Sequence, residues 1–126
     1  MMKHPLPLAT LLSVLLVSPL AAQEAAPTKS VGDLYKERAE LSGKQVTLRG
    51  KVAKVNNQIM DRNWVHLRDG TGTAADGTND ITVTTQDNAT LGDEVTVVGT
   101  LVVDTDFGSG YKYPLLVEKA TITKAP

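Results

Sequence analysis

The side chains with most capacity for chemistry are aromatic and basic residues in two short segments, 56–68 and 104–113. Together with the strands they adjoin, these segments hold four of the five aromatic residues of the chain, and cations stand beside the rings. Aromatic faces stack on bases and sugars, while arginine and lysine pair with phosphates. We therefore expect a ligand site built from Met60, Arg62, Trp64, His66, Arg68, Phe107, Tyr111, Lys112 and Tyr113.

The same rings have a structural interpretation. Large aromatic residues mostly serve hydrophobic cores. In that case Trp64 and Phe107 cap one end of the domain, and the tyrosines pack on their own loop.

A metal site is a further hypothesis, because His66 and Met60 are the histidine and the methionine that follow residue 22. Copper prefers imidazole and thioether ligands. Two protein ligands do not close a site, so a dimer or a carboxylate such as that of Asp61 would have to complete it. A single histidine on a strand is more often a hydrogen-bonded structural residue, so we assign no metal ligand and leave the cofactor unknown.

Catalysis has little support in the composition. The chain has no cysteine, so disulfides and thiolate ligands are excluded. Ser109 lies between two glycines but lacks the spacing of a nucleophile elbow. The aspartates near residues 76–80 and 104–106 lack the full ligand series of a calcium loop. We expect a binding protein rather than an enzyme.

The N-terminal segment has the features of a secretory signal. Lys3 precedes an apolar stretch from Leu8 to Leu20, and Ala21 and Ala22 suit a signal peptidase. The apolar run is too short to cross a bilayer. We expect a cleavable signal over 1–22, a flexible leader over 23–29, one domain over 30–126, and a periplasmic location. Without Lys3 the chain is mildly acidic, which argues against strong nucleic-acid binding.

The domain begins with a helix and continues with strands. Ser30 is a helix N-cap, and apolar residues at three- and four-residue spacing predict a helix over 31–41. From Gln45 the apolar residues alternate, which predicts a strand. Its phase changes after Val52, so we expect a bend at Gly50 and a bulge near Val52.

Four more strands follow at regular spacing. The predicted strands cover 63–68, 80–85, 93–103 and 115–122, and the connecting loops cover 56–62 and 104–113. Five strands with a bent first strand and a flanking helix predict an all-β, five-stranded OB-type β-barrel. Ligands of such barrels usually lie across the second and third strands, between the two loops named above.

Residues 54–72 (KVNNQIMDRNWVHLRDGTG), 79–84 (NDITVT) and 106–111 (DFGSGY) carry a resemblance to a known group. The chain resembles small exported bacterial OB-fold, nucleic-acid-binding-like proteins, some associated with nitrite-reductase gene clusters. The resemblance spans nearly all of the chain after the signal and departs from the group's pattern at Asp61, where a glycine is expected. It implies the fold more firmly than the ligand.

Three functions remain open at this point. The first is an exported OB-fold binding protein for single-stranded nucleic acid or another extended or anionic ligand. The second is a periplasmic accessory protein for a metalloenzyme or redox system, handling copper or haem or docking on the partner. The third is a protein-interaction module that docks through the edge of the barrel.

Overall fold

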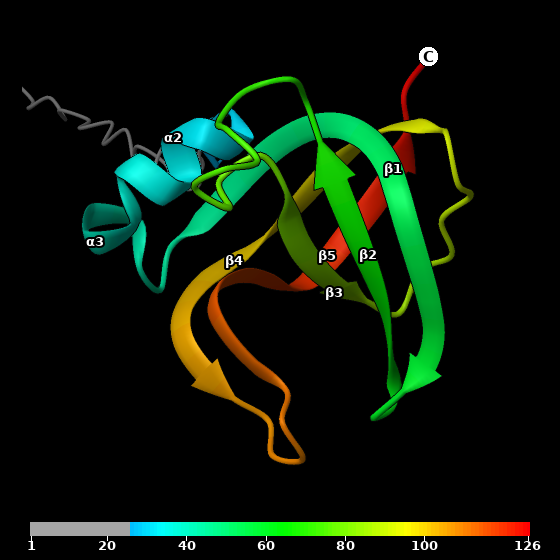
Figure 1. The fold of residues 1–126 in the computed structure, drawn as a ribbon. Coiled ribbons are helices and arrows are strands. Elements are labelled where there is room, and N and C mark those ends of the chain that lie inside the picture. Colours follow the sequence, from blue (N-terminus) through cyan, green and yellow to red (C-terminus); the bar gives the residue numbers. More distant parts are fainter. Residues whose placement is uncertain (1–25) are drawn as a thin grey trace, which may run out of the picture.

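A computed structural model gives the fold of residues 26–126 (Figure 1). The elements along the chain are α2 (Val31–Lys36), α3 (Arg38–Leu41), β1 (Gln45–Ile59), β2 (Arg62–Arg68), β3 (Ile81–Thr85), β4 (Glu94–Asp106) and β5 (Lys112–Lys124). The expected signal, 1–22, lies outside the described residues. Within residues 26–126 no helix is long and apolar enough to span a membrane.

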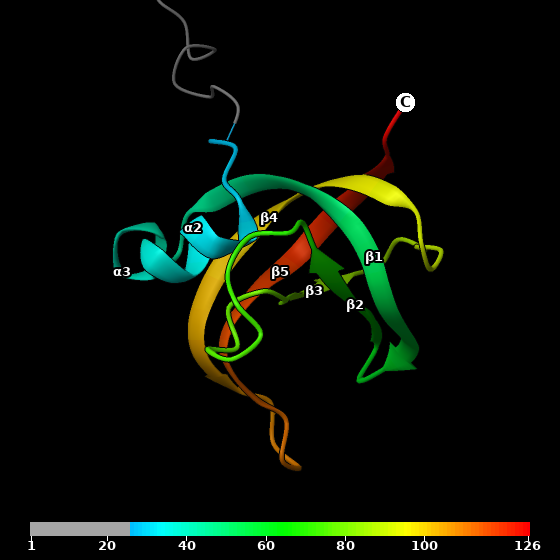
Figure 2. The same ribbon diagram turned by 45° about the horizontal axis from the view of Figure 1, so that its top comes forward.

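The five strands close into a ring in the order β1-β2-β3-β5-β4 (Figures 1 and 2). Strands β3 and β5 pair in parallel, and every other neighbouring pair is antiparallel. This order confirms the predicted OB-type arrangement of five strands.

Strand β1 makes the closure possible because it serves both halves of the sheet. Residues 45–51 pair with β4 and residues 51–59 pair with β2, and the strand curves strongly between the two (Figure 1). The pairing with β2 shifts between Val52 and Lys54, as the change of apolar phase predicts. At Gly50 a Cβ would lie 2.9 Å from the Arg68 carbonyl oxygen, so only glycine fits the bend.

The core is formed by the inward residues of all five strands. Along β1 and β4 the alternation predicted from the sequence holds: Val46, Leu48 and Leu101 are fully buried, while their neighbours are exposed or half-buried. In β3 all five residues are buried, the threonines included. The helices add Val31, Leu34 and Leu41 to the same core. Burial of a side chain of this size stabilises the fold by about 1.5–3 kcal/mol.

The predicted single helix over 31–41 is wrong in one respect, because it breaks at Glu37. The backbone of Glu37 has φ −102° and ψ 16°, its N–H closes the last turn of α2 on Asp33, and its carbonyl accepts the first bonds of α3. The Glu37 carboxylate also bonds the Lys29 ammonium at 2.7 Å. The break changes the direction of the chain so that Leu41 reaches the core.

The start of α2 is held by three side-chain oxygens. The N–H groups of Val31 and Gly32 donate to Asp69 Oδ2 (2.9 Å) and Thr71 Oγ1 (2.8 Å). The next N–H, of Asp33, donates to Ser30 Oγ at 3.0 Å. These N–H groups have no partner inside a helix, so the Asp-Gly-Thr-Gly segment docks the helix on the loop between β2 and β3.

Strands β1, β4 and β5 extend further than predicted. The loop expected over 56–62 shrinks to a turn at Met60 and Asp61, both with positive φ, which suits a tight hairpin. Half of the loop expected over 104–113 is paired strand, since Thr105 pairs with Tyr113 and Asp106 with Lys112. Aspartate tolerates the left-handed region that the Asp61 position needs.

The described part of the leader is attached to the barrel. The Lys29 N–H donates to the Thr47 carbonyl, and the Thr47 N–H donates to the Pro27 carbonyl, each at 2.8 Å. Residues 27–29 therefore lie along the first half of β1.

Replacement of Asp69 tests the docking of α2. The variant Asp69→Ala leaves the Val31 and Thr71 N–H groups without their acceptor, so we expect the free energy of unfolding to fall by about 1–3 kcal/mol. Asp69→Asn keeps one acceptor oxygen and should lose less. Urea unfolding followed by Trp64 fluorescence gives the values.

The control is Glu94→Ala, which removes one exposed carboxylate that has no side-chain bond within the described residues. Its effect should stay within about 0.5 kcal/mol. Equal stability of the Asp69→Ala variant and this control would contradict the docking role.

Candidate functional site

The outer face of β2 carries the functional side chains. Asn63, Val65 and Leu67 are buried on the strand, and a strand alternates its side chains between two faces. The outward set is therefore the one that the sequence analysis selected: Arg62, Trp64, His66 and Arg68.

Neighbouring strands continue this face in rows. His66 pairs with Lys54 of β1 and Thr82 of β3. Paired residues share a face, so a cation, the imidazole and a hydroxyl form one row. In the next row Trp64 stands between Asn56 and Thr84. A third row pairs Arg68 with Lys51. We call these three rows together with Arg62 the β2 face.

An aromatic cluster closes one end of the β2 face. The Trp64 ring centroid lies 5.2 Å from that of Phe107, 5.8 Å from Tyr111 and 5.4 Å from Tyr113. The indole Nε1–H donates to the Ile59 carbonyl at 2.8 Å. The β1–β2 turn and the β4–β5 hairpin therefore meet at the same rim, as the barrel topology predicts.

Burial of the cluster is uneven. Trp64 is only 3% exposed, which agrees with the structural interpretation of this residue. Phe107, Tyr111 and Tyr113 are half-buried. Each aromatic pair adds about 0.5–1.5 kcal/mol beyond burial, so displacing the hairpin from Trp64 is costly. A ligand therefore contacts the half-buried rings of Phe107, Tyr111 and Tyr113, which cover Trp64.

Arg62 adds a cation to the cluster. Its guanidinium carbon lies 5.0 Å from the Phe107 ring centroid and 5.8 Å from that of Trp64. Lys112 is exposed on the hairpin, and Met60 is half-buried in the β1–β2 turn. Both lie at the same rim as Arg62, because Ile59 pairs with Arg62 and the hairpin touches Trp64.

Asp80 organises the other end of the β2 face. One Asp80 carboxylate oxygen lies 2.7 Å from His66 Nδ1, and the other accepts from Arg68 Nε at 3.0 Å. Tyr35 of α2 donates its hydroxyl to the Asp80 carbonyl at 2.6 Å. The sequence does not reveal this role, because Asp80 follows the turn-forming segment 69–79 at the start of a predicted strand and Tyr35 lies inside the predicted helix over 31–41.

The pKa of Tyr35 reflects this position. Burial raises the pKa of its phenol above the ordinary 10.0, and the Asp80 carboxylate raises it further. Burial also raises the pKa of Tyr113 in the aromatic cluster. Both rings thus stay neutral hydrogen-bonding and stacking groups over the physiological pH range.

The structure separates Met60 from His66. Met60 lies in the turn before Arg62, and the four residue steps from 62 to 66 along β2 span about 13 Å. His66 Nδ1 is already paired with Asp80. Within residues 26–126 there is no group of three or more histidine and acidic side chains that could hold a metal ion.

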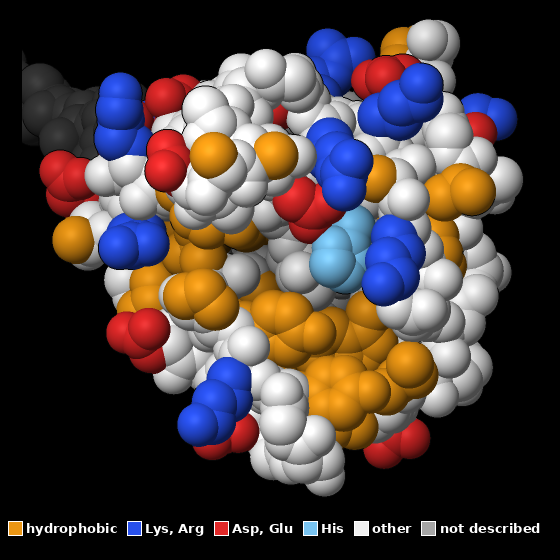
Figure 3. All heavy atoms as spheres, viewed as in Figure 1, with side chains coloured by type: hydrophobic (Ala, Val, Ile, Leu, Met, Phe, Trp, Pro, Cys, Tyr) orange, Lys and Arg blue, Asp and Glu red, His pale blue; other side chains and the backbone are white. Residues whose placement is uncertain are grey.

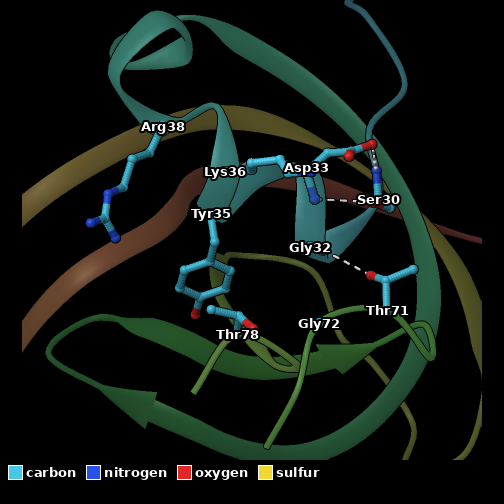
Figure 4. A pocket seen from close by; sticks show the side chains of 9 residues that line it. All are labelled: Ser30, Gly32, Asp33, Tyr35, Lys36, Arg38, Thr71, Gly72 and Thr78. Atoms are coloured by element: carbon cyan, nitrogen blue, oxygen red, sulfur yellow. Dashed lines mark hydrogen bonds between the residues drawn. The ribbon is translucent and has the colours of Figure 1, made fainter. Parts of the chain in front are cut away.

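Of three hollows on the described surface, one is lined in part by the β2 face, and the largest of the three lies beside α2. This α2 groove has a volume of about 560 Å³ (Figure 4). It is lined by Ser30, Gly32, Asp33, Tyr35, Lys36, Arg38, Thr71, Gly72 and Thr78. A second hollow of about 370 Å³ includes Arg62 and Thr84, and a third of the same size includes Lys112 and Tyr113.

The surface shows the same division. In Figure 3 a field of hydrophobic side chains occupies the lower part of the face that β2 crosses in Figure 1. A histidine, basic and acidic side chains lie directly above it, around a recess. A ligand on this face thus meets rings at one end and charged groups at the other.

Alkaline titration tests the environment of Tyr35. Because the folded protein releases this proton at higher pH than the unfolded chain, the stability it contributes is complete below pH 10 and is lost as the pH rises through the folded-state pKa. Tyrosinate absorbance should show late-titrating phenols, and Tyr35→Phe should remove one of them. An unchanged late phase in Tyr35→Phe would contradict the assignment.

Comparison with known proteins places the fold. No protein-family model and no curated protein matches the chain. Among solved structures, it is similar to part of an asparaginyl-tRNA synthetase from Entamoeba histolytica in complex with asparaginyl-adenylate (15% identity, TM-score 0.51, 82% of this chain and 24% of that one). It is also similar to part of a putative aspartyl-tRNA synthetase from Leishmania major Friedlin (19% identity, TM-score 0.50, 79% and 21%). The chain thus spans about a quarter or less of these proteins, and at such identities the likeness concerns the OB-type fold alone.

Proposed function

We propose that this protein is an exported OB-fold module that binds single-stranded nucleic acid, or a chain of similar anionic character, on the β2 face. The observation that carries the proposal is the alternation of Arg62, Trp64, His66 and Arg68 on one strand face, with the hairpin rings packed at its end. The sequence of residues 1–22 supports export.

Charge on the β2 face suits a phosphate backbone. Lys51, Lys54 and Arg62 have no ion-pair partner within the part of the chain that the structure describes. Arg68 shares Asp80 with His66, so its charge is partly balanced. Lys51 and Lys54 lie in neighbouring rows, and Arg62 lies beyond the row of Trp64. Cations spread along the face in this way suit an extended ligand with repeated negative charges.

The aromatic cluster suits planar bases. Stacking on an aromatic side chain contributes about 1–3 kcal/mol per base and does not depend on sequence. Phe107 and the two hairpin tyrosines are half-buried and keep part of their surface free. Arg62 lies against two of the rings and can pair with a phosphate next to a stacked base.

The charge of the chain sets the expected strength of binding. The chain is near neutral overall, so we expect weak affinity that depends steeply on salt.

The similar structures and the geometry bear on the choice among the three functions. Two of the similar structures are tRNA synthetases, which agrees with a nucleic-acid ligand without identifying one. The separation of Met60 from His66 speaks against a shared metal site, and no particular contact among the described residues favours a protein-docking role.

Binding of an oligothymidylate tests the proposal. A fluorescein-labelled strand of about 15 nucleotides should bind at low salt, and the affinity should fall steeply between about 20 and 200 mM salt. Arg62→Ala should weaken binding about three- to tenfold and lower the salt slope by about one. Arg62→Lys keeps the charge and should preserve the slope while losing part of the affinity. Fluorescence anisotropy gives each constant.

The matched control is Lys124→Ala. It removes one cation whose side chain is 74% exposed at the end of β5, so binding should stay at the wild-type level. Two outcomes would overturn the proposal: absence of binding by the wild-type protein at low salt, or equal loss of affinity in Lys124→Ala and Arg62→Ala.

A further inference from the structure

The lining of the α2 groove contains no residue of the β2 face, but Tyr35 connects the groove with that face. The Tyr35 ring lines the groove, and its hydroxyl bonds Asp80, whose carboxylate holds His66 and Arg68. The groove therefore lies next to the Asp80 end of the β2 face. Figure 4 shows the Tyr35 and Arg38 side chains on the same side of the helices, above the loop with Thr71 and Thr78.

The groove offers unpaired positive groups. Lys36 and Arg38 line it, and neither has an ion-pair partner within 4.0 Å among residues 26–126. Gly72 also lines the groove, and its backbone N–H donates to no acceptor among those residues. A guanidinium, an ammonium and a free backbone N–H together are the donors that bind a phosphate.

The carboxylate in the groove is already engaged. Asp33 accepts the Ser30 N–H in the capping box, and bonds with Ser30 hold the pKa of Asp33 below its usual value. Figure 4 shows this carboxylate turned toward Ser30 and away from Arg38. The Arg38 end of the groove is therefore the end that suits an anion.

The hollows beyond Arg38 are less suited to a phosphate. Arg38 also borders a small hollow of about 180 Å³ with Asp104 and Pro114, which leads on to the hairpin hollow of Lys112. Asp104 and Asp106 line that side, and their negative charges oppose a second phosphate. The anion subsite thus ends at Arg38.

We infer that the α2 groove is a subsite for a terminal phosphorylated nucleotide of the strand bound on the β2 face. The terminal base lies against the Tyr35 ring, and its phosphate lies at the Arg38 guanidinium, with Lys36 elsewhere in the lining of the same groove. This inference rests on the proposed function. It adds that the protein distinguishes a phosphorylated strand end from an unphosphorylated one.

Oligothymidylates of about eight nucleotides, with a 5′-phosphate, a 3′-phosphate or neither, test the inference by anisotropy competition at low salt. For the wild-type protein, one phosphorylated form should bind about three- to tenfold more tightly than the unphosphorylated strand. Arg38→Ala should abolish this advantage and leave the affinity for the unphosphorylated strand nearly unchanged. Lys36→Ala should reduce the advantage.

Lys124→Ala serves as the control, because it removes a cation outside the groove and should keep the full advantage. The inference is overturned if neither phosphate improves wild-type binding, or if the advantage persists in Arg38→Ala; in both cases binding of the unphosphorylated strand leaves the proposed function standing. If no strand binds, the proposed function fails and the subsite fails with it.

Discussion

The structure depends on the bend of one strand, whose two halves pair with different neighbours. Strand β1 hydrogen-bonds to β4 through its first half and to β2 through its second half. The bend at Gly50 and the bulge after Val52 let a single strand do both. Because the ring closes, the β1–β2 turn and the β4–β5 hairpin meet at one rim, although more than 40 residues of sequence separate them. Every contact of the aromatic cluster follows from that meeting.

The β2 face combines a rigid end and a polar end. Trp64 is fixed by its hydrogen bond to Ile59 and by three ring contacts, so the hairpin is held in place before any ligand arrives. At the other end Asp80 bonds His66 of β2 and Tyr35 of α2, so it holds these two elements together. Preorganised side chains of this kind lose little entropy on binding. The helix is thus part of the recognition surface as well as a cover for the core.

Much of the fold follows from sequence alone, because apolar alternation shows which strand face is buried and glycine shows where the chain bends. His66 falls within the predicted strand over 63–68, whereas Arg62 was predicted in the preceding loop and is the first residue of β2. Pairing between residues that are far apart in the sequence is harder to predict. The hairpin beyond residue 103 is polar on its surface and rich in turn residues, so it was predicted as a loop, whereas ladder bonds to β5 extend it to Asp106. Asp69 and Asp80 have turn-forming neighbours, and only the fold reveals that their partners lie on α2 and β2.

The proposed function requires a single strand to lie on the β2 face, across β2 and beside the hairpin rings. Nuclear magnetic resonance of the isotope-labelled protein, titrated with an oligothymidylate at low salt, tests this placement residue by residue. We expect shifts at the Trp64 indole N–H, the Arg62 and Arg68 Nε–H groups and the backbone of β2, with little change on the outer surface of β4. Shifts confined to β4 or to the C-terminal end of β5 would contradict it.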